Sequence, residues 1–229
     1  MDRPDVAFAA KELCRRMSAP CSADLAALRH LARYLLGSPR QVYQYRWQPE
    51  AALDVYADTD WAGCSETRRS TSGGCALRGG HLIKHWATTQ KVVTLSSGEA
   101  ELAGVVKAAS EGLGLQSVAR DFGLTVEVRL HTDSSAALGI VNRSGIGKVR
   151  HLAVSQLWVQ EKLRDGTFTL YKFRGEMNPA DLFTKHLDQV KIKQCLKFAG
   201  VLAEAGRAES APCLAAEVEA FLAALRRPL

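Results

Sequence analysis

The chain has 229 residues, of which 47% are hydrophobic and 24% are charged, and its formal net charge is +6. This length suffices for one domain with a buried core and some additional segments. The composition excludes an intrinsically disordered chain, because such chains are poor in apolar residues. The modest positive charge permits a polyanionic partner without identifying one.

The start of the sequence and its cysteines indicate an intracellular protein. The first residues, MDRPDVAFAAKEL, are charged from residue 2 and contain no apolar signal-peptide core. No uninterrupted apolar run approaches membrane-spanning length. The six cysteines form no CxxC pair and no zinc-type spacing, which favours free thiols in a reducing compartment. We therefore expect a cytoplasmic or nuclear protein that is neither secreted nor bound to a membrane.

The N-terminal segment predicts two helices followed by a tether. The stretch SADLAALRHLARYLLGS has Ser22 as its N-cap and ends at Gly37. Its apolar positions recur with helical period, and they are Leu25, Leu28, Leu31 and Leu35. An exposed stripe of that size promotes aggregation, so it has to find a surface. We expect residues 4–36 to dock loosely through a small interface, with residues 38–48 as a hinge; a firmly packed extension of one core is the alternative.

From about residue 48 the pattern changes to strands. The segments ALDVYADTDWA, TSGGCALRG and GHLIKHWATT are separated by a polar loop and by Gly79-Gly80, which is a hairpin signal. They predict a three-stranded antiparallel meander. Between residues 53 and 58, apolar residues alternate with polar ones, as in a strand with one apolar and one polar face.

The rest of the chain alternates helices and strands. A long helical pattern in SSGEAELAGVVKAASEGLGLQSVARDFG stops at Gly123. TVEVRLHTDSSAALGIVN predicts a strand and a short helix, VRHLAVSQLWVQEKLRDG a helix, TFTLYKF a strand, and NPADLFTKHL a final helix. This order implies an α/β fold with a mixed sheet flanked by helices. Beyond residue 190, QVKIKQCLKFAGVL and PCLAAEVEAFLAALRRPL predict a helical tail packed on the domain.

Four acidic residues stand out by their positions. Asp58 lies on the first strand of the meander, and Glu101 lies near the start of the long helix. Asp133 ends the fourth strand, and Asp181 opens the last helix. A mixed sheet can gather such side chains into one site, where carboxylates require a cation, and oxygen ligands favour Mg²⁺ or Mn²⁺ over zinc. The alternative for each acid is a solvated surface residue or a contact that serves a helix start.

At these residues the sequence resembles a known family. The motifs YADTDWAGC, RRSTSGGCALRGGHLIKHWATTQKVVTLSSGEAEL, HTDSSAAL, RHLAVSQLWVQEKL and NPADLFTK resemble, in this order, the ribonuclease H domain of copia-type LTR retrotransposon Pol polyproteins. The resemblance implies a ribonuclease H-like mixed five-stranded sheet with helices on both faces over residues 48–190. It also implies a helical remnant of the reverse transcriptase connecting region at residues 1–47. The helical pattern beyond residue 190 adds a helical tail at residues 191–229.

The resemblance further implies an activity and a set of ligands. The family's domain is an endonuclease that hydrolyses the RNA strand of RNA–DNA hybrids, and its catalytic, metal-binding acids carry over onto Asp58, Glu101, Asp133 and Asp181. Two Mg²⁺ or Mn²⁺ ions would activate a water and stabilise the leaving 3′ oxygen. Candidates for phosphate contacts are Arg68, Arg69, Lys84, Lys91, Lys148 and Arg150. Reverse transcriptase or integrase portions of a polyprotein are further candidate partners.

Two motifs contain a second acid that could compete for the role. Asp58 is preferred to Asp60 because it is the first aspartate of ADTDWA, and Glu101 is preferred to Glu99 by its place in AEL. Two glutamates at this spacing lie ~200° apart around a helix, so only one of them can face the site. We expect Glu99 on the side of Lys107.

The chain also departs from the family. It has Ala153 and Ser155 where the family usually has an acid, and often a base, after the histidine of RHLAVSQ, and FRGEMNPA contains no histidine. It has no YxDD polymerase motif, so reverse transcription is not supported. Two alternatives stay open: a catalytically silent retroelement fragment that binds nucleic acid or nothing, and another nuclease of the same fold, such as an integrase or junction resolvase.

Overall fold

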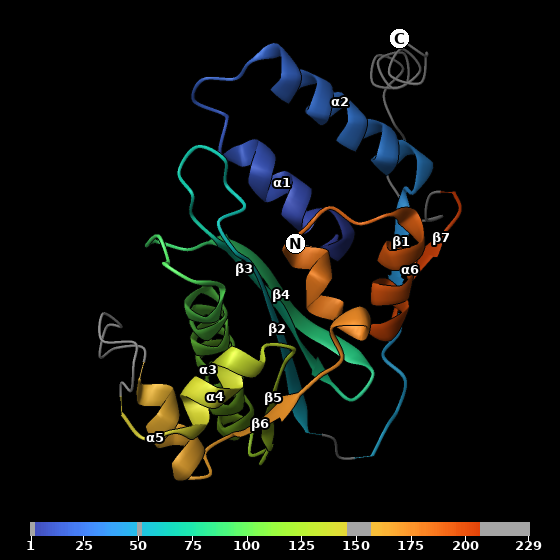
Figure 1. The fold of residues 1–229 in the computed structure, drawn as a ribbon. Coiled ribbons are helices and arrows are strands. Elements are labelled where there is room, and N and C mark those ends of the chain that lie inside the picture. Colours follow the sequence, from blue (N-terminus) through green and yellow to red (C-terminus); the bar gives the residue numbers. More distant parts are fainter. Residues whose placement is uncertain (1–2, 50–51, 146–156, 207–229) are drawn as a thin grey trace.

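A five-stranded mixed sheet lies at the centre of the computed structural model, which describes residues 3–49, 52–145 and 157–206 (Figure 1). Its strands, in the spatial order β4-β3-β2-β5-β6, are β2 (Leu53–Asp60), β3 (Thr71–Arg78), β4 (His81–Thr89), β5 (Val128–Thr132) and β6 (Thr169–Lys172). β2, β3 and β4 pair antiparallel, whereas β5 pairs parallel with both β2 and β6. The predicted α/β class and meander are confirmed, and the strand that carries Asp58 is central.

Helices cover both faces of the sheet, as predicted (Figure 1). One face is covered by α3 (Ser97–Asp121), α4 (Ser135–Asn142) and α5 (Trp158–Arg164). The other is covered by α1 (Ala7–Cys14), by α6 (Gln189–Phe198) and by the short 3-10 helix η4 (Pro179–Phe183). Two further 3-10 turns are η1 (Pro4–Val6) and η3 (Gly175–Met177). In the described part of the chain, no helix is long and apolar enough to cross a membrane.

The central strand β2 is buried on both faces. Val55 and Ala57 belong to the core under α3, whereas Tyr56 belongs to the core under η4 and α6. The expectation of one apolar and one polar face is therefore wrong, because Tyr56 is only 7% exposed and Asp58 only 2%. A buried carboxylate on a central strand is costly unless a cation or hydrogen bonds stabilise it, which marks Asp58 as a functional candidate.

The segments outside residues 48–190 are less helical than expected. β1 (Arg40–Tyr43) lies within the proposed hinge and pairs antiparallel with β7 (Val201–Glu204), which lies in the proposed helical tail. The final helix predicted from NPADLFTKHL is also shorter than expected and has 3-10 geometry. The apolar stripe beyond residue 207 and the first part of the predicted third helix, VRHLAVSQ, lie outside the described residues. The proposed domain boundaries stay a prediction.

The N-terminal segment is firmly packed at its start and loosely packed further on. Residues 4–8 are buried against the core under η4 and α6, so the expectation of loose docking is wrong for them. α2 (Ser22–Gly37), by contrast, has no buried residue, and Leu25 and Leu28 are each 51% exposed. Its N-cap is Cys21 rather than Ser22, because the Asp24 carboxylate accepts a hydrogen bond from the Cys21 N–H.

Candidate metal centre

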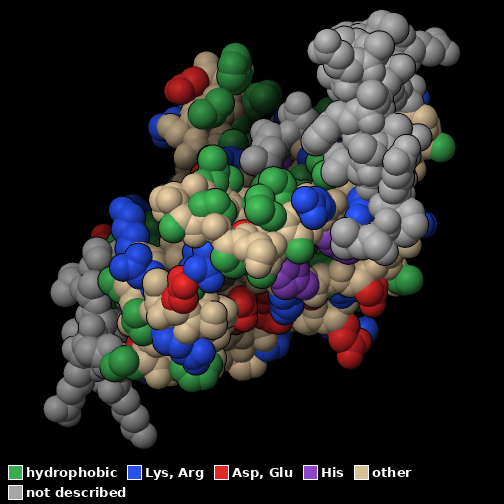
Figure 2. Space-filling model, turned by 90° about the horizontal axis from the view of Figure 1, so that it is seen from above, with side chains coloured by type: hydrophobic (Ala, Val, Ile, Leu, Met, Phe, Trp, Pro, Cys, Tyr) green, Lys and Arg blue, Asp and Glu red, His purple; other side chains and the backbone are tan. Residues whose placement is uncertain are grey.

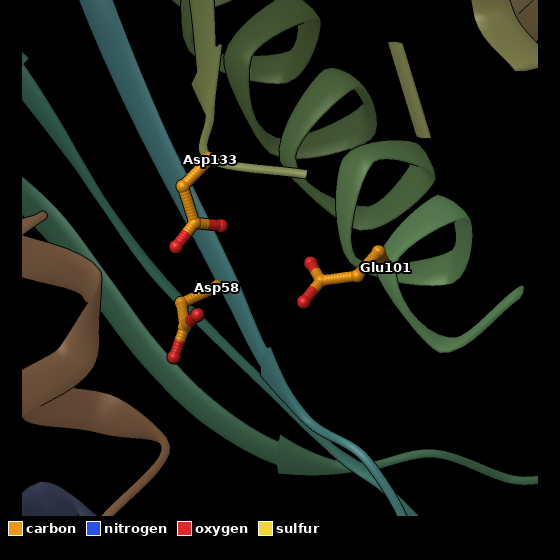
Figure 3. Close-up of side chains that lie close together, drawn as sticks. All are labelled: Asp58, Glu101 and Asp133. Atoms are coloured by element: carbon orange, nitrogen blue, oxygen red, sulfur yellow. The ribbon is translucent and has the colours of Figure 1, made fainter. Parts of the chain in front are cut away.

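Three carboxylates converge where β2 and β5 meet the start of α3 (Figure 3). Asp58 projects from β2, Glu101 from the first turns of α3, and Asp133 directly follows β5. One oxygen of each carboxylate lies within 4.8 Å of the others. Asp58 and Asp133 meet because β2 and β5 are parallel neighbours, which brings their C-terminal ends to the same edge of the sheet. The structure thus brings together three of the four acids that the sequence singled out.

Glu101 reaches the other two acids because α3 approaches β2 closely. A Cβ atom on Gly104 would lie 2.5 Å from the Thr59 hydroxyl oxygen, so only glycine permits this contact. The helix begins at Ser96, whose side chain accepts a hydrogen bond from the Glu99 N–H. α3 therefore starts at a fixed point beside the strand that carries Asp58.

Glu99 does not point into the carboxylate group, in agreement with the choice of Glu101. It is only 6% exposed, and its position on the side of Lys107 stays a prediction. Its carboxylate accepts a hydrogen bond from the Leu95 N–H at 2.9 Å and so stabilises the start of α3. The sequence contains a signal for this role that we missed, namely an acid three residues after the capping serine.

The three carboxylates repel one another. Burial, together with the charges of Asp58 and Asp133, raises the pKa of Glu101 to about 8. Burial and the charge of Asp58 also raise the pKa of Asp133. Partly buried carboxylates held this closely form a site that a divalent cation would stabilise, and their oxygen donors are those that Mg²⁺ and Mn²⁺ prefer.

Asp181 lies outside the group of three. It is only 7% exposed, and its Oδ1 lies 2.9 Å from Lys185 Nζ. The same ammonium lies 3.4 Å from Asp58 Oδ2, so Lys185 links the two aspartates. Burial raises the pKa of Asp181, while Lys185 opposes that shift. Sequence reasoning missed Lys185, although a cation four residues after Asp181 in ADLFTK is a detectable signal.

The segment that carries Asp181 is fixed against the sheet next to Asp58. The Asn178 side chain is completely buried and donates a hydrogen bond to the Ala57 carbonyl at 3.0 Å. The Thr184 hydroxyl donates to the Asp58 carboxylate. Thr184 fits there because Gly73, the partner of Asp58 on β3, has no side chain; a Cβ atom would lie 2.6 Å from Thr184 Cγ2.

The candidate phosphate-binding residues are distributed unevenly. Arg68, Arg69 and Lys91 are exposed on two loops that a hydrogen bond from the Gln90 N–H to the Ser70 carbonyl holds together. Lys84 lies on the edge strand β4 and forms an ion pair with Glu111 of α3. The remaining two candidates, Lys148 and Arg150, lie outside the described residues.

Another cation, which was not among the residues predicted from the sequence, adjoins the carboxylate group. The Lys172 ammonium donates a hydrogen bond to the Asp133 carbonyl and another, at 2.7 Å, to the Ser135 hydroxyl. It comes from β6, next to β5 in the sheet, so the parallel pairing places it near Asp133. With Lys185 it brings two ammonium groups to the edge of the carboxylate group.

Sequence comparison finds relatives among transposon polyproteins. The chain is 27% identical over 201 residues to the retrovirus-related Pol polyprotein from transposon TNT 1-94 of Nicotiana tabacum. It is 28% identical over 202 residues to the corresponding polyprotein from transposon RE1 of Arabidopsis thaliana. Each alignment covers 87% of this chain but only 15% and 14% of the respective polyprotein, so the chain corresponds to a small part of these relatives.

Structural comparison finds ribonucleases H among the similar solved structures. The RNase H1 of Halobacterium salinarum NRC-1 is similar with a TM-score of 0.40 and 14% sequence identity. The match covers 58% of this chain and 94% of that protein. No family model matches the chain.

Proposed function

We propose that this chain, a relative of the retrovirus-related Pol polyproteins of plant transposons, is a metal-dependent ribonuclease of the RNase H type. Its substrate would be the RNA strand of an RNA–DNA hybrid, cleaved internally. The observation that carries the proposal is the convergence of Asp58, Glu101 and Asp133 at the C-terminal edge of the central strands. The order of the sequence motifs and the mixed sheet support it.

The residues present fit a divalent cation. Asp58, Glu101 and Asp133 would hold it through carboxylate oxygens that come from three different elements. Burial and the charges of Asp58 and Asp133 raise the pKa of Glu101, and a bound cation would favour its ionised form. A bound Mg²⁺ or Mn²⁺ would supply Lewis-acid activation of a water and of the scissile phosphate. Asp181 would help to bind a second ion, on the side of the site where the Lys185 ammonium lies between Asp181 and Asp58.

The chain's own side chains would orient the ligands and hold the nucleic acid. The Thr184 hydroxyl, which donates to the Asp58 carboxylate, fixes the orientation of that ligand. Arg68, Arg69 and Lys91 are exposed and would contact phosphates along the backbone of the hybrid. Such contacts would make binding weaken steeply as the salt concentration rises. A choice of hybrid over duplex DNA would depend on contacts with 2′-hydroxyl groups.

The test is a cleavage assay with a labelled RNA–DNA hybrid, with and without Mg²⁺ or Mn²⁺. We expect internal cleavage of the RNA strand that EDTA abolishes, and little cleavage of duplex DNA or of a four-way junction. Asp58→Asn should reduce the rate at least about 100-fold, since even the partners that orient metal ligands are worth 10–100-fold. Asp60→Asn is the matched control, because Asp60 lies on the same strand outside the group of three.

Each alternative gives a distinct result in this assay. Preferential cutting of junctions or duplex DNA would identify another nuclease of the same fold. A folded wild-type protein that binds Mn²⁺ and hybrid but cleaves none of the substrates would instead indicate a silent fragment. A wild-type protein that binds no Mn²⁺ would contradict the proposed metal site itself.

A further inference from the structure

A buried polar cluster lies behind the carboxylate group, on the side of β4. Gln90 directly follows β4 and is only 9% exposed. Its amide nitrogen, Nε2, donates one hydrogen bond to the Ala100 carbonyl at 2.9 Å and another to the Ser72 hydroxyl at 2.8 Å. Both hydrogens of this side-chain amide are therefore used, and neither goes to solvent.

One acceptor of Gln90 belongs to α3, the helix that carries Glu101, and the other belongs to β3, the strand paired with the Asp58 strand β2. Ala100 immediately precedes Glu101 in α3, and Ser72 immediately precedes Gly73, the residue paired with Asp58. A second side chain also donates to the Ala100 carbonyl, since the Thr59 hydroxyl lies 3.3 Å from it. The start of α3 is thus hydrogen-bonded to β2 through Thr59 and to β3 through Gln90. The shared acceptor, Ala100, is one residue away from Glu101, and Thr59 is one residue away from Asp58.

This part of the molecule has a specific reason to need such bonds. One oxygen of Glu101 lies within 4.8 Å of an oxygen of Asp58 and of Asp133, and carboxylates this close repel one another when ionised, which favours separation of α3 from the sheet. A neutral side-chain amide can oppose that displacement without adding another charge, and its bonds are strong because the cluster is buried. The backbone of Gln90 is itself fixed, because its N–H donates to the Ser70 carbonyl at 2.8 Å.

We propose that Gln90 is a positioning residue: by holding the Ala100 carbonyl, it keeps Glu101 at the distance from Asp58 that metal binding requires. The inference rests on the proposed metal site. It does not place Gln90 in contact with metal or substrate. Residues that orient metal ligands from behind typically change metal affinity 10–100-fold when they are replaced.

The experiment compares two glutamines that make similar bonds at different distances from the site. Gln116 is the matched control, because it lies on α3 and its Nε2 donates to the Val126 carbonyl at 2.8 Å. Mn²⁺ affinity is measured by titration calorimetry, and stability by urea unfolding, on the whole chain. We expect Gln90→Met to weaken Mn²⁺ binding about 10–100-fold. Gln116→Met should keep the wild-type affinity even if both variants lose stability.

A third variant tests which bond of Gln90 matters. Ser72→Ala removes the other acceptor and should leave Mn²⁺ affinity within about threefold of wild type, because the bond to Ala100 remains. Wild-type affinity in Gln90→Met, or an equal loss in Gln116→Met, would overturn the inference. An equal loss in Ser72→Ala would overturn the assignment to the Ala100 carbonyl.

A variant that fails to fold and a wild-type chain that binds no metal each have a separate interpretation. If Gln90→Met does not fold, Gln90→Asn keeps a neutral amide but is one methylene too short to reach the Ala100 carbonyl. Weaker Mn²⁺ binding in Gln90→Asn supports the inference, and wild-type binding contradicts it. A wild-type chain that binds no Mn²⁺ contradicts the proposed function and removes the basis of this inference. A wild type that binds Mn²⁺ beside a Gln90→Met that binds equally well contradicts this inference alone.

Discussion

The two faces of the sheet are built in different ways. The face under α3 is covered by helices that follow the strands in sequence, and its core draws on β2, β5, α3 and α4. The opposite face is assembled from short segments far apart in sequence, namely α1, η4, α6 and β7. The face under α3, called the regular face below, is therefore specified mainly by the local sequence pattern. The opposite face, called the assembled face, is specified by long-range contacts among segments too short to be stable alone.

The acidic residues at the candidate site also differ between the two faces. Glu101 comes from the regular face, where Gly104 allows its helix to approach the sheet closely and Gln90 is hydrogen-bonded to that helix. Asp181 and Lys185 come from the assembled face, where they form an ion pair beside Asp58. The comparison indicates that the assembled face supplies positive charge to the site, whereas the regular face supplies a carboxylate under repulsion.

The largest expected effect concerns the two cores. Leu102 is completely buried under α3, and Leu182 in η4 is 5% exposed. Leu→Ala changes in cores cost about 2–5 kcal/mol, with the larger values where the surroundings cannot collapse. In urea unfolding, we expect Leu102→Ala to lie near the upper end of that range and Leu182→Ala near the lower end. Equal losses would show that the assembled face is as tightly packed as the regular one.

The sequence predicted the regular face better for a physical reason. The meander and α3 follow from local periodicity, whereas the choice of Asp58, Glu101 and Asp133 among neighbouring acids followed from the family resemblance, and the structure brings these three together. The pairing of β1 with β7 has no such signal, because two four-residue strands from opposite ends of the chain meet only after folding. The bridging position of Lys185 likewise depends on how η4 packs over Gly73.

The second expected effect is a pH dependence that comes from the regular face. The pKa of Glu101 is raised to about 8, so the folded chain binds a proton there more tightly than the unfolded chain. Its stabilising contribution is complete below the ordinary glutamate pKa and is lost as the pH rises through 8, with a slope of at most about 1.4 kcal/mol per pH unit. Without metal, unfolding free energies measured from pH 5 to 9 should fall less in Glu101→Gln than in wild type.

The matched variant for this pH effect is Asp181→Asn on the assembled face. The pKa of Asp181 is also raised, but Lys185 opposes the shift, so its removal should change the pH profile less. An Asp181→Asn profile flatter than that of Glu101→Gln would reverse the comparison of the two carboxylates.

The third effect concerns how α1 is attached to the sheet. The Lys11 ammonium donates a hydrogen bond to the Thr71 hydroxyl at 2.7 Å, and the Arg15 guanidinium contacts Cys64 Sγ in the loop after β2. Lys11→Met keeps most of the side-chain volume and removes the donor, so we expect a loss of about 1 kcal/mol in urea unfolding. Lys193→Met is the control, because Lys193 lies on α6 and makes no hydrogen bond or ion pair with the described part of the chain. A Lys11→Met variant as stable as this control would show that α1 is held by its apolar contacts alone.

The smallest expected effect is at α2, the outermost element of the assembled face. Figure 2 shows hydrophobic side chains exposed on the side of the molecule where α2 lies in Figure 1. Since Leu28 is 51% exposed, Leu28→Ser should change the unfolding free energy by no more than about 0.5 kcal/mol. A helix with no buried residue also opens locally at little cost, so the amides of residues 25–35 should exchange with solvent much faster than those of β2. Hydrogen exchange followed by mass spectrometry or NMR decides this. Protection of residues 25–35 equal to that of β2 would mean that α2 belongs to the same cooperative unit as the central strand, and that its exposed leucines do not reflect loose docking.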